Sequence, residues 1–307
     1  MSAATAKPSD RRTVPSTRSD IFLELIKPRI TFMVLLTVAI GYFCAAPAEA
    51  NVATLLHVLL GTALSCSGCG ALNQYFERDV DGFMDRTRFR PLPAQRISNF
   101  TAATLGGVLS VTGVLYLAAA VNTVAAFVNA LTVLSYLFLY TPLKRVHPLS
   151  TLAGAVPGAL PPVIGWAAAT GQIGSGAIIL FAILFLWQVP HFLAIGWMYR
   201  EDYARAGFPM LVVIDREGDS TARLMLVYAL ALLPVSLLLV AAGAAGRFYF
   251  WSAVVAGTFY AWHAYRTGVE RTLKSARRLL LASVVYLPLL FLALFVDHMW
   301  KHLRVWL

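Results

Sequence analysis

Residues 73–96 read NQYFERDVDGFMDRTRFRPLPAQR, and they gather acidic and basic side chains at the end of a long apolar run. If that run continues as a helix, Asn73, Glu77 and Asp81 lie at i, i+4 and i+8 and share one face over about 12 Å. Their oxygens form a ladder of hard ligands. Such ligands suit Mg²⁺, which takes one or two carboxylates together with substrate phosphate oxygens. The ladder predicts a Mg²⁺ site at the end of a membrane span.

Four arginines follow the ladder directly, at positions Arg86, Arg88, Arg90 and Arg96. A guanidinium group grips phosphate in bidentate fashion, so this segment fits a diphosphate site better than a lipid-facing surface. For any single arginine, an ion pair at the membrane surface is an equal alternative. That alternative is weaker for the ladder, because three acceptors on one face repel each other without a cation.

The composition is that of a polytopic membrane protein. The 307 residues are 59% hydrophobic and only 13% charged, and the mean hydropathy is +0.69. Apolar stretches of spanning length predict an all-α bundle of nine transmembrane helices. We expect them at residues 28–46, 52–76, 101–120, 122–140, 150–169, 175–198, 221–242, 247–265 and 279–298.

Basic residues fall unevenly between the two sides of the predicted spans. With the N-terminus in the cytoplasm, 22 of the 25 Lys and Arg residues lie on the cytoplasmic side. The positive-inside rule therefore orients the chain, and an odd number of spans places the C-terminus outside. Residues 1–20 are polar and predict a disordered cytoplasmic tail, and residues 21–307 predict a single membrane-embedded domain.

The net charge of +10 does not indicate nucleic-acid binding. The basic residues lie in short loops beside apolar helices, where they serve topology and contact anionic membrane lipid. No interleaved aromatic platform accompanies them. We therefore expect no nucleic-acid partner.

Several further motifs identify the family that the chain resembles. Besides N-x3-E-R-D-V-D at 73–81 and R-T-x-x-R-P-L at 86–92, they are KPRI at 27–30, TPLKR at 141–145, GALPPVIGW at 158–166, WQVPHF at 187–192 and YREDYARAGFPML at 199–211. Together they resemble the UbiA superfamily of intramembrane prenyltransferases. The PHF motif, followed by REDY and GFPML, is similar to the protohaem IX farnesyltransferase (haem O synthase) branch.

The resemblance implies a nine-helix bundle with a central cavity in the inner membrane of a bacterial cell. The implied reaction transfers the farnesyl group of farnesyl diphosphate to a vinyl group of haem B, adds water and releases diphosphate, with Mg²⁺ as cofactor. The product, haem O, would serve terminal oxidases, which suggests a haem A synthase or an oxidase assembly factor as a further partner. The active-site loops would face the cytoplasm.

The resemblance also implies roles for individual residues. Asn73, Glu77 and Asp81 would hold Mg²⁺, with Glu201 or Asp202 approaching from the second motif. Most of the superfamily has two Asp four residues apart in that motif, so a second ion is less firmly implied here. The remaining diphosphate oxygens would be neutralised by Arg86, Arg90, Lys144 and Arg200.

Three residues are candidates for the haem side of the site. His191 would orient the porphyrin, ligate iron or shuttle a proton during hydration, and a structural hydrogen-bonded histidine is the alternative. Lys27 and Arg29 would meet the haem propionates, and topology anchors are the alternative for both.

Other functions remain to be weighed. A UbiA-type enzyme could prenylate an aromatic quinone precursor, although WQVPHF and REDY favour haem. A transporter would also place charge inside a bundle, but its site is expected near the bilayer midplane and often within internal repeats. An assembly role for an oxidase complex would leave the Mg²⁺ ladder unexplained.

Overall fold

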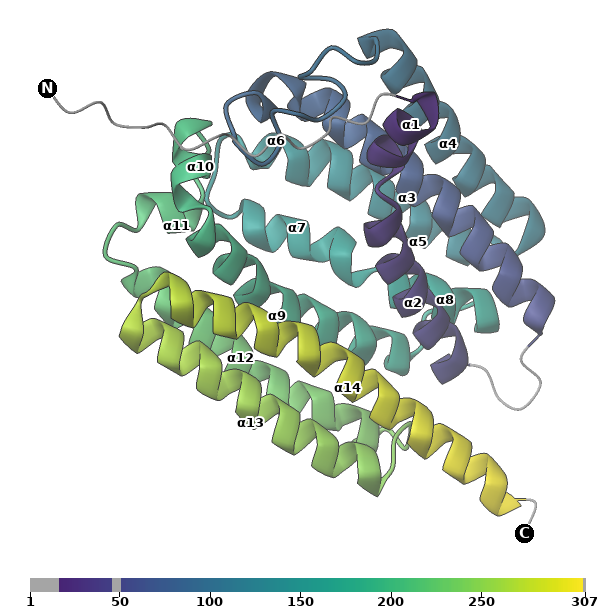
Figure 1. The fold of residues 1–307 in the computed structure, drawn as a ribbon. Helices are drawn as coiled ribbons and strands as arrows, with labels where there is room; N and C mark the ends of the chain where they lie inside the picture. Colours follow the sequence, from purple (N-terminus) through teal and green to yellow (C-terminus); the bar gives the residue numbers. More distant parts are fainter. Residues whose placement is uncertain (1–16, 46–50, 306–307) are drawn as a thin grey trace, which may run out of the picture.

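The computed structural model describes residues 17–45 and 51–305, and every regular element in these ranges is helical (Figure 1). The helices are α1 (Arg18–Ile26), α2 (Pro28–Ala45), α3 (Val52–Asp81), α4 (Asn99–Ala120), α5 (Thr123–Leu134), the π-helix η1 (Ser135–Tyr140), α6 (Thr141–Leu143), α7 (Ser150–Ala159), α8 (Pro161–Thr170), α9 (Ser175–Met198), α10 (Arg200–Arg205), α11 (Leu211–Ile214), α12 (Asp219–Ala241), α13 (Arg247–Glu270) and α14 (Leu273–Val305). The predicted all-α membrane fold is confirmed. The predicted tail lies outside the described residues up to position 16, and α1 begins at Arg18.

Eight stretches in the described residues are long and apolar enough to cross a membrane. They are α2, α3, α4, the continuous run 123–143, the run 150–170, α9, α12 and residues 273–297 of α14. The remaining predicted span, 247–265, lies within α13, a helix of 24 residues that packs between α12 and α14. It is not among the eight, because the Tyr, Trp and His residues within it, such as Tyr260, Trp262 and His263, make it less apolar than the other spans.

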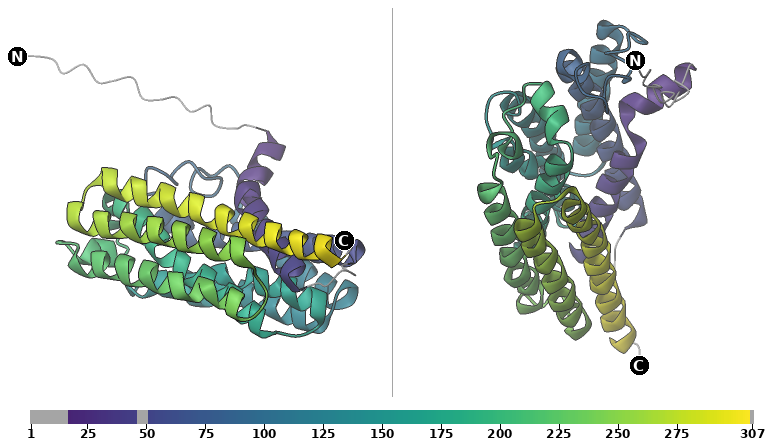
Figure 2. Two further views of the ribbon diagram at one scale, coloured as in Figure 1. Left: turned by 90° about the horizontal axis from the view of Figure 1, so that it is seen from below. Right: turned by 60° about the vertical axis from the view of Figure 1, so that its left-hand side comes forward.

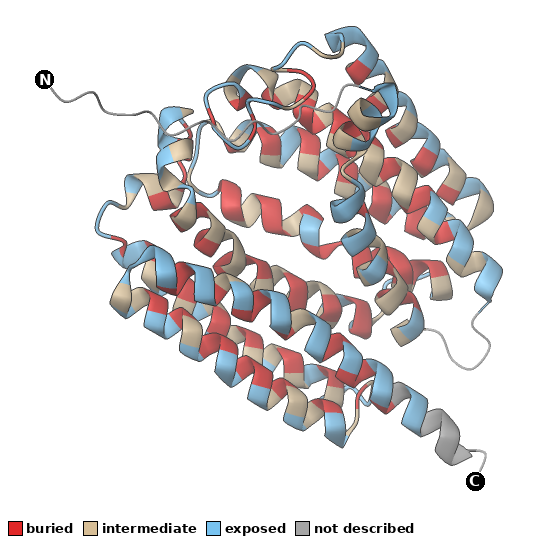
Figure 3. Cartoon of the chain, in the orientation of Figure 1, coloured by how far each residue is buried: buried red, intermediate tan, exposed pale blue. Residues whose placement is uncertain are grey.

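The spanning helices form two groups that meet along α7 and α9 (Figures 1 and 2). One group joins α2, α3, α4, α5 and α8 around a buried apolar core, and the other joins α9, α12, α13 and α14 around a larger one. Buried residues gather on the helix sides that face neighbours, and exposed residues face outward (Figure 3). The predicted central cavity stays a prediction.

Small residues let the helices approach closely. A Cβ atom on Gly165 of α8 would lie 1.9 Å from the Val38 carbonyl oxygen of α2. On Gly68 of α3 it would lie 2.5 Å from the Gly106 carbonyl oxygen of α4. Gly68 lies within the SCSGCG sequence, where Cys66 and Cys69 are free thiols.

The spanning helices lie roughly along one axis and alternate in direction, so their ends fall into two sets. At one end, α3, α9 and α13 finish and α4, α12 and α14 begin, and the short helices α6, α10 and α11 gather there (Figure 1). We call this the site end of the bundle. The helix α1 also lies at this end and projects from the bundle (Figure 2).

Candidate active site

The ladder occupies the last two turns of α3 and faces the interior of the bundle. All three ladder residues are buried: Asn73 is 3% exposed, Glu77 is 4% exposed and Asp81 is 0% exposed. Asp79, between them in sequence, points to the surface and lies 3.6 Å from Arg78. The spacing of four residues therefore puts the three oxygen-bearing groups on one buried face.

Each ladder residue contacts its own cationic side chain. Lys27 Nζ donates to Asn73 Oδ1 at 3.0 Å, and Lys144 Nζ donates to Glu77 Oε1 at 3.0 Å. Arg90 donates to Asp81 Oδ2 at 2.7 Å, and the same guanidinium nitrogen lies 3.9 Å from Glu77 Oε2. The ladder is therefore one face of a buried charge cluster, which we call the ladder cluster: Asn73, Glu77, Asp81, Lys27, Lys144 and Arg90.

Local backbone features deliver the three cations. Lys27 joins α1 to α2 in the left-handed conformation, with φ 49° and ψ 61°. Lys144 follows the π-helix η1 and the single turn α6. Arg90 belongs to the loop after α3, where Thr87 Oγ1 donates to the Asp81 carbonyl oxygen at 2.8 Å and turns the chain back over the helix end.

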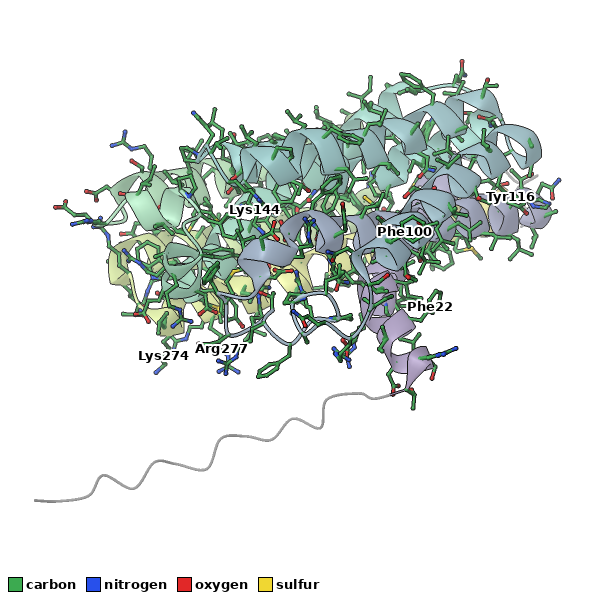
Figure 4. All side chains as sticks on the ribbon, turned by 90° about the horizontal axis from the view of Figure 1, so that it is seen from above. Phe22, Phe100, Tyr116, Lys144, Lys274 and Arg277 are labelled. Carbon is green, nitrogen blue, oxygen red and sulfur yellow. The ribbon has the colours of Figure 1, made fainter. Side chains whose placement is uncertain are left out.

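The surroundings shift the pKa values of both lysines. Burial, together with the nearby Arg90 guanidinium, lowers the pKa of Lys27 to about 8. Burial would also lower the pKa of Lys144, but the Tyr140 phenol and the Glu77 carboxylate outweigh it and raise that pKa above its ordinary value. Lys144 lies within the bundle (Figure 4) and remains protonated at neutral pH.

The cluster has acceptor capacity that its own cations leave unused. Asp81 Oδ1 is buried and has no hydrogen-bond partner among the described residues. A buried oxygen of this kind normally has a partner. Asp81 and Glu77 together offer the carboxylates that Mg²⁺ requires, so the donor set fits this ion.

The second motif lies apart from the ladder acids. Asp202 forms an ion pair with Arg205, which also donates to Asp85 Oδ2 at 2.7 Å, and Glu201 is exposed. No three His, Cys, Asp or Glu side chains within residues 17–45 and 51–305 come together as a metal site. A contribution of Glu201 or Asp202 to Mg²⁺ stays a prediction.

Aromatic rings from α10 and the loop after it close over the cations. The Lys144 Nζ atom lies 4.6 Å from the Phe208 ring centroid and 5.8 Å from that of Tyr203. Arg86 donates to the Tyr203 hydroxyl at 3.4 Å, and its guanidinium lies 5.4 Å from the Tyr199 ring centroid. Arg200 lies over Trp197 at 5.4 Å. The loop after α3 and α10 thus meet above the ladder cluster.

The haem-side candidates separate in the structure. His191 Nδ1 hydrogen-bonds Ser283 Oγ of α14 at 2.7 Å, and its ring stacks on Trp187 at 4.8 Å. Arg29 is exposed and makes no ion pair with any described residue. Lys27 contacts the ladder through Asn73, a pairing that no motif predicted.

Two other contacts were also missed. Phe208 was not assigned to the site, although it stands in the quoted GFPML motif, and the contact of Asp85 with Arg205 was not predicted, although Asp85 was expected to orient cations of the site. The signal for Phe208 was its place six residues after Asp202 of the acidic motif. No signal in the sequence pairs Asp85 with Arg205, which lies 120 residues away.

Comparisons with known proteins agree with this arrangement. The UbiA prenyltransferase family matches residues 34–297. A protoheme IX farnesyltransferase from Solibacter usitatus (strain Ellin6076) is 47% identical over 285 residues, covering 90% of this chain and 98% of the relative. A protein of the same name from Anaeromyxobacter sp. (strain Fw109-5) is 40% identical over 298 residues, covering 97% and 99%.

Solved structures share the fold at low sequence identity. A structure concerned with digeranylgeranylglyceryl phosphate synthase has a TM-score of 0.78 at 16% identity and covers 91% of this chain and 98% of its own. A UbiA homolog from Archaeoglobus fulgidus, solved with DMAPP and Mg²⁺, has a TM-score of 0.62 at 15% identity and covers 90% and 99%. These two similarities concern the arrangement of helices.

Proposed function

The chain belongs to the UbiA prenyltransferase family, and from this premise we propose that it transfers the farnesyl group of farnesyl diphosphate to a vinyl group of haem B. The relatives that carry the name protoheme IX farnesyltransferase support this choice of substrates. The enzyme is a membrane-embedded prenyltransferase, and its products are haem O and diphosphate.

The observation that carries the proposal is the excess of positive charge in the ladder cluster. Three cations, Lys27, Lys144 and Arg90, surround only two carboxylates, those of Glu77 and Asp81. A prenyl diphosphate carries about three negative charges, and one bound Mg²⁺ offsets two of them. The charge of a Mg²⁺–diphosphate complex therefore balances that of the cluster. Arg86, in the loop after α3, and Arg200, the first residue of α10, would neutralise the outer phosphate.

Glu77 and Asp81 would hold the metal, and Asn73 would supply a neutral oxygen. The open acceptor is Asp81 Oδ1, which is buried and free of hydrogen bonds to described residues. When bound, Mg²⁺ draws negative charge from the leaving diphosphate. Asp202, which pairs with Arg205, would orient this arginine and the loop beside it.

The chemistry begins with cleavage of the bond between C1 of the farnesyl group and its diphosphate oxygen. The bonding electrons leave with the diphosphate, where Lys144, Lys27 and Arg90 stabilise the new charge. The Tyr203 and Phe208 rings, which cover Lys144, face the developing allylic cation and exclude water from it.

The allylic carbon then bonds to the terminal carbon of the haem vinyl group. This leaves a cation on the vinyl carbon next to the porphyrin, which takes up water and loses one proton to give the hydroxyethylfarnesyl side chain. We assign His191 to the haem side of the reaction, where it orients the porphyrin or accepts that proton. Its hydrogen bond to Ser283 fixes the ring for either role. Lys27 is assigned to diphosphate because it contacts the ladder, and Arg29 keeps the propionates as its proposed partner.

The protein spans the membrane several times. We assign it to the bacterial inner membrane, with the N-terminus and the site end in the cytoplasm and the C-terminus outside. The excess of basic residues at the site end supports this orientation. Handing haem O to a haem A synthase or an oxidase assembly factor would complete the proposed role.

Turnover in nanodiscs tests the proposal. The purified protein is incubated with haem B, farnesyl diphosphate and Mg²⁺, and the haem product is identified by its mass. We expect hydroxyethylfarnesyl haem from the wild type and its loss with EDTA, Glu77→Gln or Asp81→Asn. Asp79→Asn is the matched control, because Asp79 is on the same helix but points to the surface.

The alternatives predict different results in the same assay. Prenylation of an aromatic acceptor with no haem product would keep the family reaction and overturn the choice of haem. No transfer to either acceptor by a folded preparation would leave transport or assembly as the functions to test.

A further inference from the structure

A second group of charges lies at the site end of the bundle and shares no residue with the ladder cluster. Here the last turns of α13 and the first turns of α14 line an open cavity of about 120 Å³. Its lining residues are Trp262, His263, Arg266, Glu270, Ser275 and Arg278. This volume has room for several water molecules and therefore for a phosphate group. We call it the α13–α14 cavity.

Arg278 is the cation that this cavity leaves without a partner. The other arginine in the lining, Arg266, donates from Nε to Glu270 Oε1 at 2.8 Å. Outside the cavity, Arg271 pairs with Asp219. Arg278 makes no hydrogen bond or ion pair with any residue that the structure describes, although its charge acts across the cavity on the Glu270 carboxylate. The cavity therefore offers free guanidinium donors, which suit an oxyanion.

Neighbouring basic residues point elsewhere. Figure 4 shows Lys274 and Arg277 projecting outward from the surface at the start of α14, and neither lines the cavity. Successive positions on a helix differ by about 100° in direction. Both Arg277 and Arg278 are exposed, but only Arg278 lines the cavity.

The walls of the cavity are fixed by hydrogen bonds. Thr272 and Ser275 cap the start of α14 reciprocally: the Thr272 backbone N–H donates to Ser275 Oγ at 3.2 Å and the Ser275 N–H donates to Thr272 Oγ1 at 3.1 Å. Thr267 Oγ1 of α13 donates to the Ser275 carbonyl oxygen at 3.1 Å. The positive end of the α14 dipole also favours an anion here.

The cavity lies at the level of the lipid headgroups. About twenty helical residues cover the roughly 30 Å hydrocarbon core, so a span that starts at Arg247 leaves the hydrocarbon near Arg266. Exposed apolar side chains run along α13 up to this level. They are Trp251, Val255, Phe259, Trp262, Tyr265 and Val269. Trp262, 54% exposed, belongs to both this stripe and the cavity lining.

We propose that the α13–α14 cavity binds the phosphate of an anionic phospholipid. Arg278 donates to the phosphate oxygens, and Arg266 supports it from the opposite wall. The acyl chains lie along the apolar stripe of α13, and Trp262 lies at the boundary between headgroup and chain, where tryptophan is favoured. The site binds a lipid of the surrounding membrane and is independent of the diphosphate site.

Binding of a short-chain lipid to the full-length protein in detergent tests this. The probes are dioctanoyl phosphatidylglycerol, dioctanoyl phosphatidylcholine and inorganic phosphate, with binding followed by native mass spectrometry and by the shift in melting temperature. We expect preference for phosphatidylglycerol in the wild type. Affinity should fall about tenfold or more in Arg278→Gln, stay within twofold in Arg277→Gln, and be largely retained in Arg278→Lys.

Each result decides the proposal. An equal loss in Arg277→Gln and Arg278→Gln would mean that surface charge alone attracts the lipid, and would overturn it. Inorganic phosphate binding as tightly as phosphatidylglycerol would overturn the assignment to lipid, and equal binding of phosphatidylcholine would overturn the requirement for an anion. The melting curve without lipid confirms that each variant is folded.

Discussion

Replacing Lys144 by Met should destabilise the protein, and a second replacement, Glu77→Gln, should restore most of the lost stability. The two charged atoms are 3.0 Å apart, and the side chains are only 8% and 5% exposed. Each charge has therefore lost most of its water and depends on the other. Removing one of them leaves a buried charge uncompensated, whereas removing both does not.

The structure sets the size of the effect. At 3.0 Å and an effective dielectric constant of about 20, the attraction between Lys144 and Glu77 is about 5.5 kcal/mol. Arg90, at 3.9 Å from Glu77, adds about 4.3 kcal/mol on the same scale. Because Arg90 stays in place, we expect Lys144→Met to cost about 3 kcal/mol, the lower end of the range for a broken buried pair.

Melting in one detergent, at one scan rate, measures this for the wild type, both single variants and the double variant. A loss of about 3 kcal/mol corresponds to a fall in melting temperature of roughly 6–12 °C. The double variant should melt within a few degrees of the wild type and yet remain inactive, since the diphosphate has lost a cation and the metal a ligand. If the two single losses add to within about 0.5 kcal/mol, the two charges do not stabilise each other and the reasoning is refuted.

Three further predictions concern packing, pH and metal. Gly165→Ala should lower stability by about 3 kcal/mol, because its Cβ atom would lie 1.9 Å from a carbonyl oxygen of α2. Gly107→Ala is the control and should be neutral or stabilising, because its Cβ atom would have nothing within 4 Å. The melting temperatures of the two variants are compared, and equal shifts would contradict the close contact at Gly165. Burial of Asp215 alone would raise its pKa, but the hydrogen bonds from Thr221 and the nearby backbone outweigh burial and lower the pKa below its ordinary value. The Asp215 carboxylate should therefore stabilise the fold fully above about pH 5, and this stabilisation should disappear as the pH falls through the pKa of the folded state. The melting difference between wild type and Asp215→Asn, about 1 kcal/mol, should vanish in acid, and a difference that persists there would argue against the titration. Mg²⁺ should increase the affinity for farnesyl diphosphate at least tenfold in the wild type but not in Asp81→Asn, as measured by calorimetry, and an equal increase in both would remove Asp81 from the metal site.

The sequence was a good guide where the determining interactions are local. The four-residue spacing of the ladder predicts its common face because helical periodicity operates over a few residues. The positions of the apolar spans follow for the same reason. The α13 helix extends beyond the span predicted at 247–265, because its apolar part is followed by further helical residues that include Arg266 and Glu270.

The partners of the ladder could not be predicted, because they depend on tertiary structure. Lys27 reaches Asn73 through a left-handed residue between two helices, a conformation that Lys rarely adopts and that no motif signalled. Lys144 reaches Glu77 after the widened turn of η1. The ion pair of Asp202 with Arg205, three residues away, was not predicted either, and the role of Asp202 at the metal stays a prediction.

The pairing pattern of the ladder cluster has a consequence for how the protein is made. Asp81 and its partner Arg90 are 9 residues apart, whereas Glu77 and Lys144 are 67 apart. At about 5–20 residues per second, Arg90 is synthesised within about two seconds of Asp81, but Glu77 waits roughly 3–13 s for Lys144. During that interval Arg90, which also faces Glu77, is the nearby cation that lowers the cost of a carboxylate in the membrane. Arg90 thus lowers the cost of inserting the nascent span before Lys144 has been synthesised.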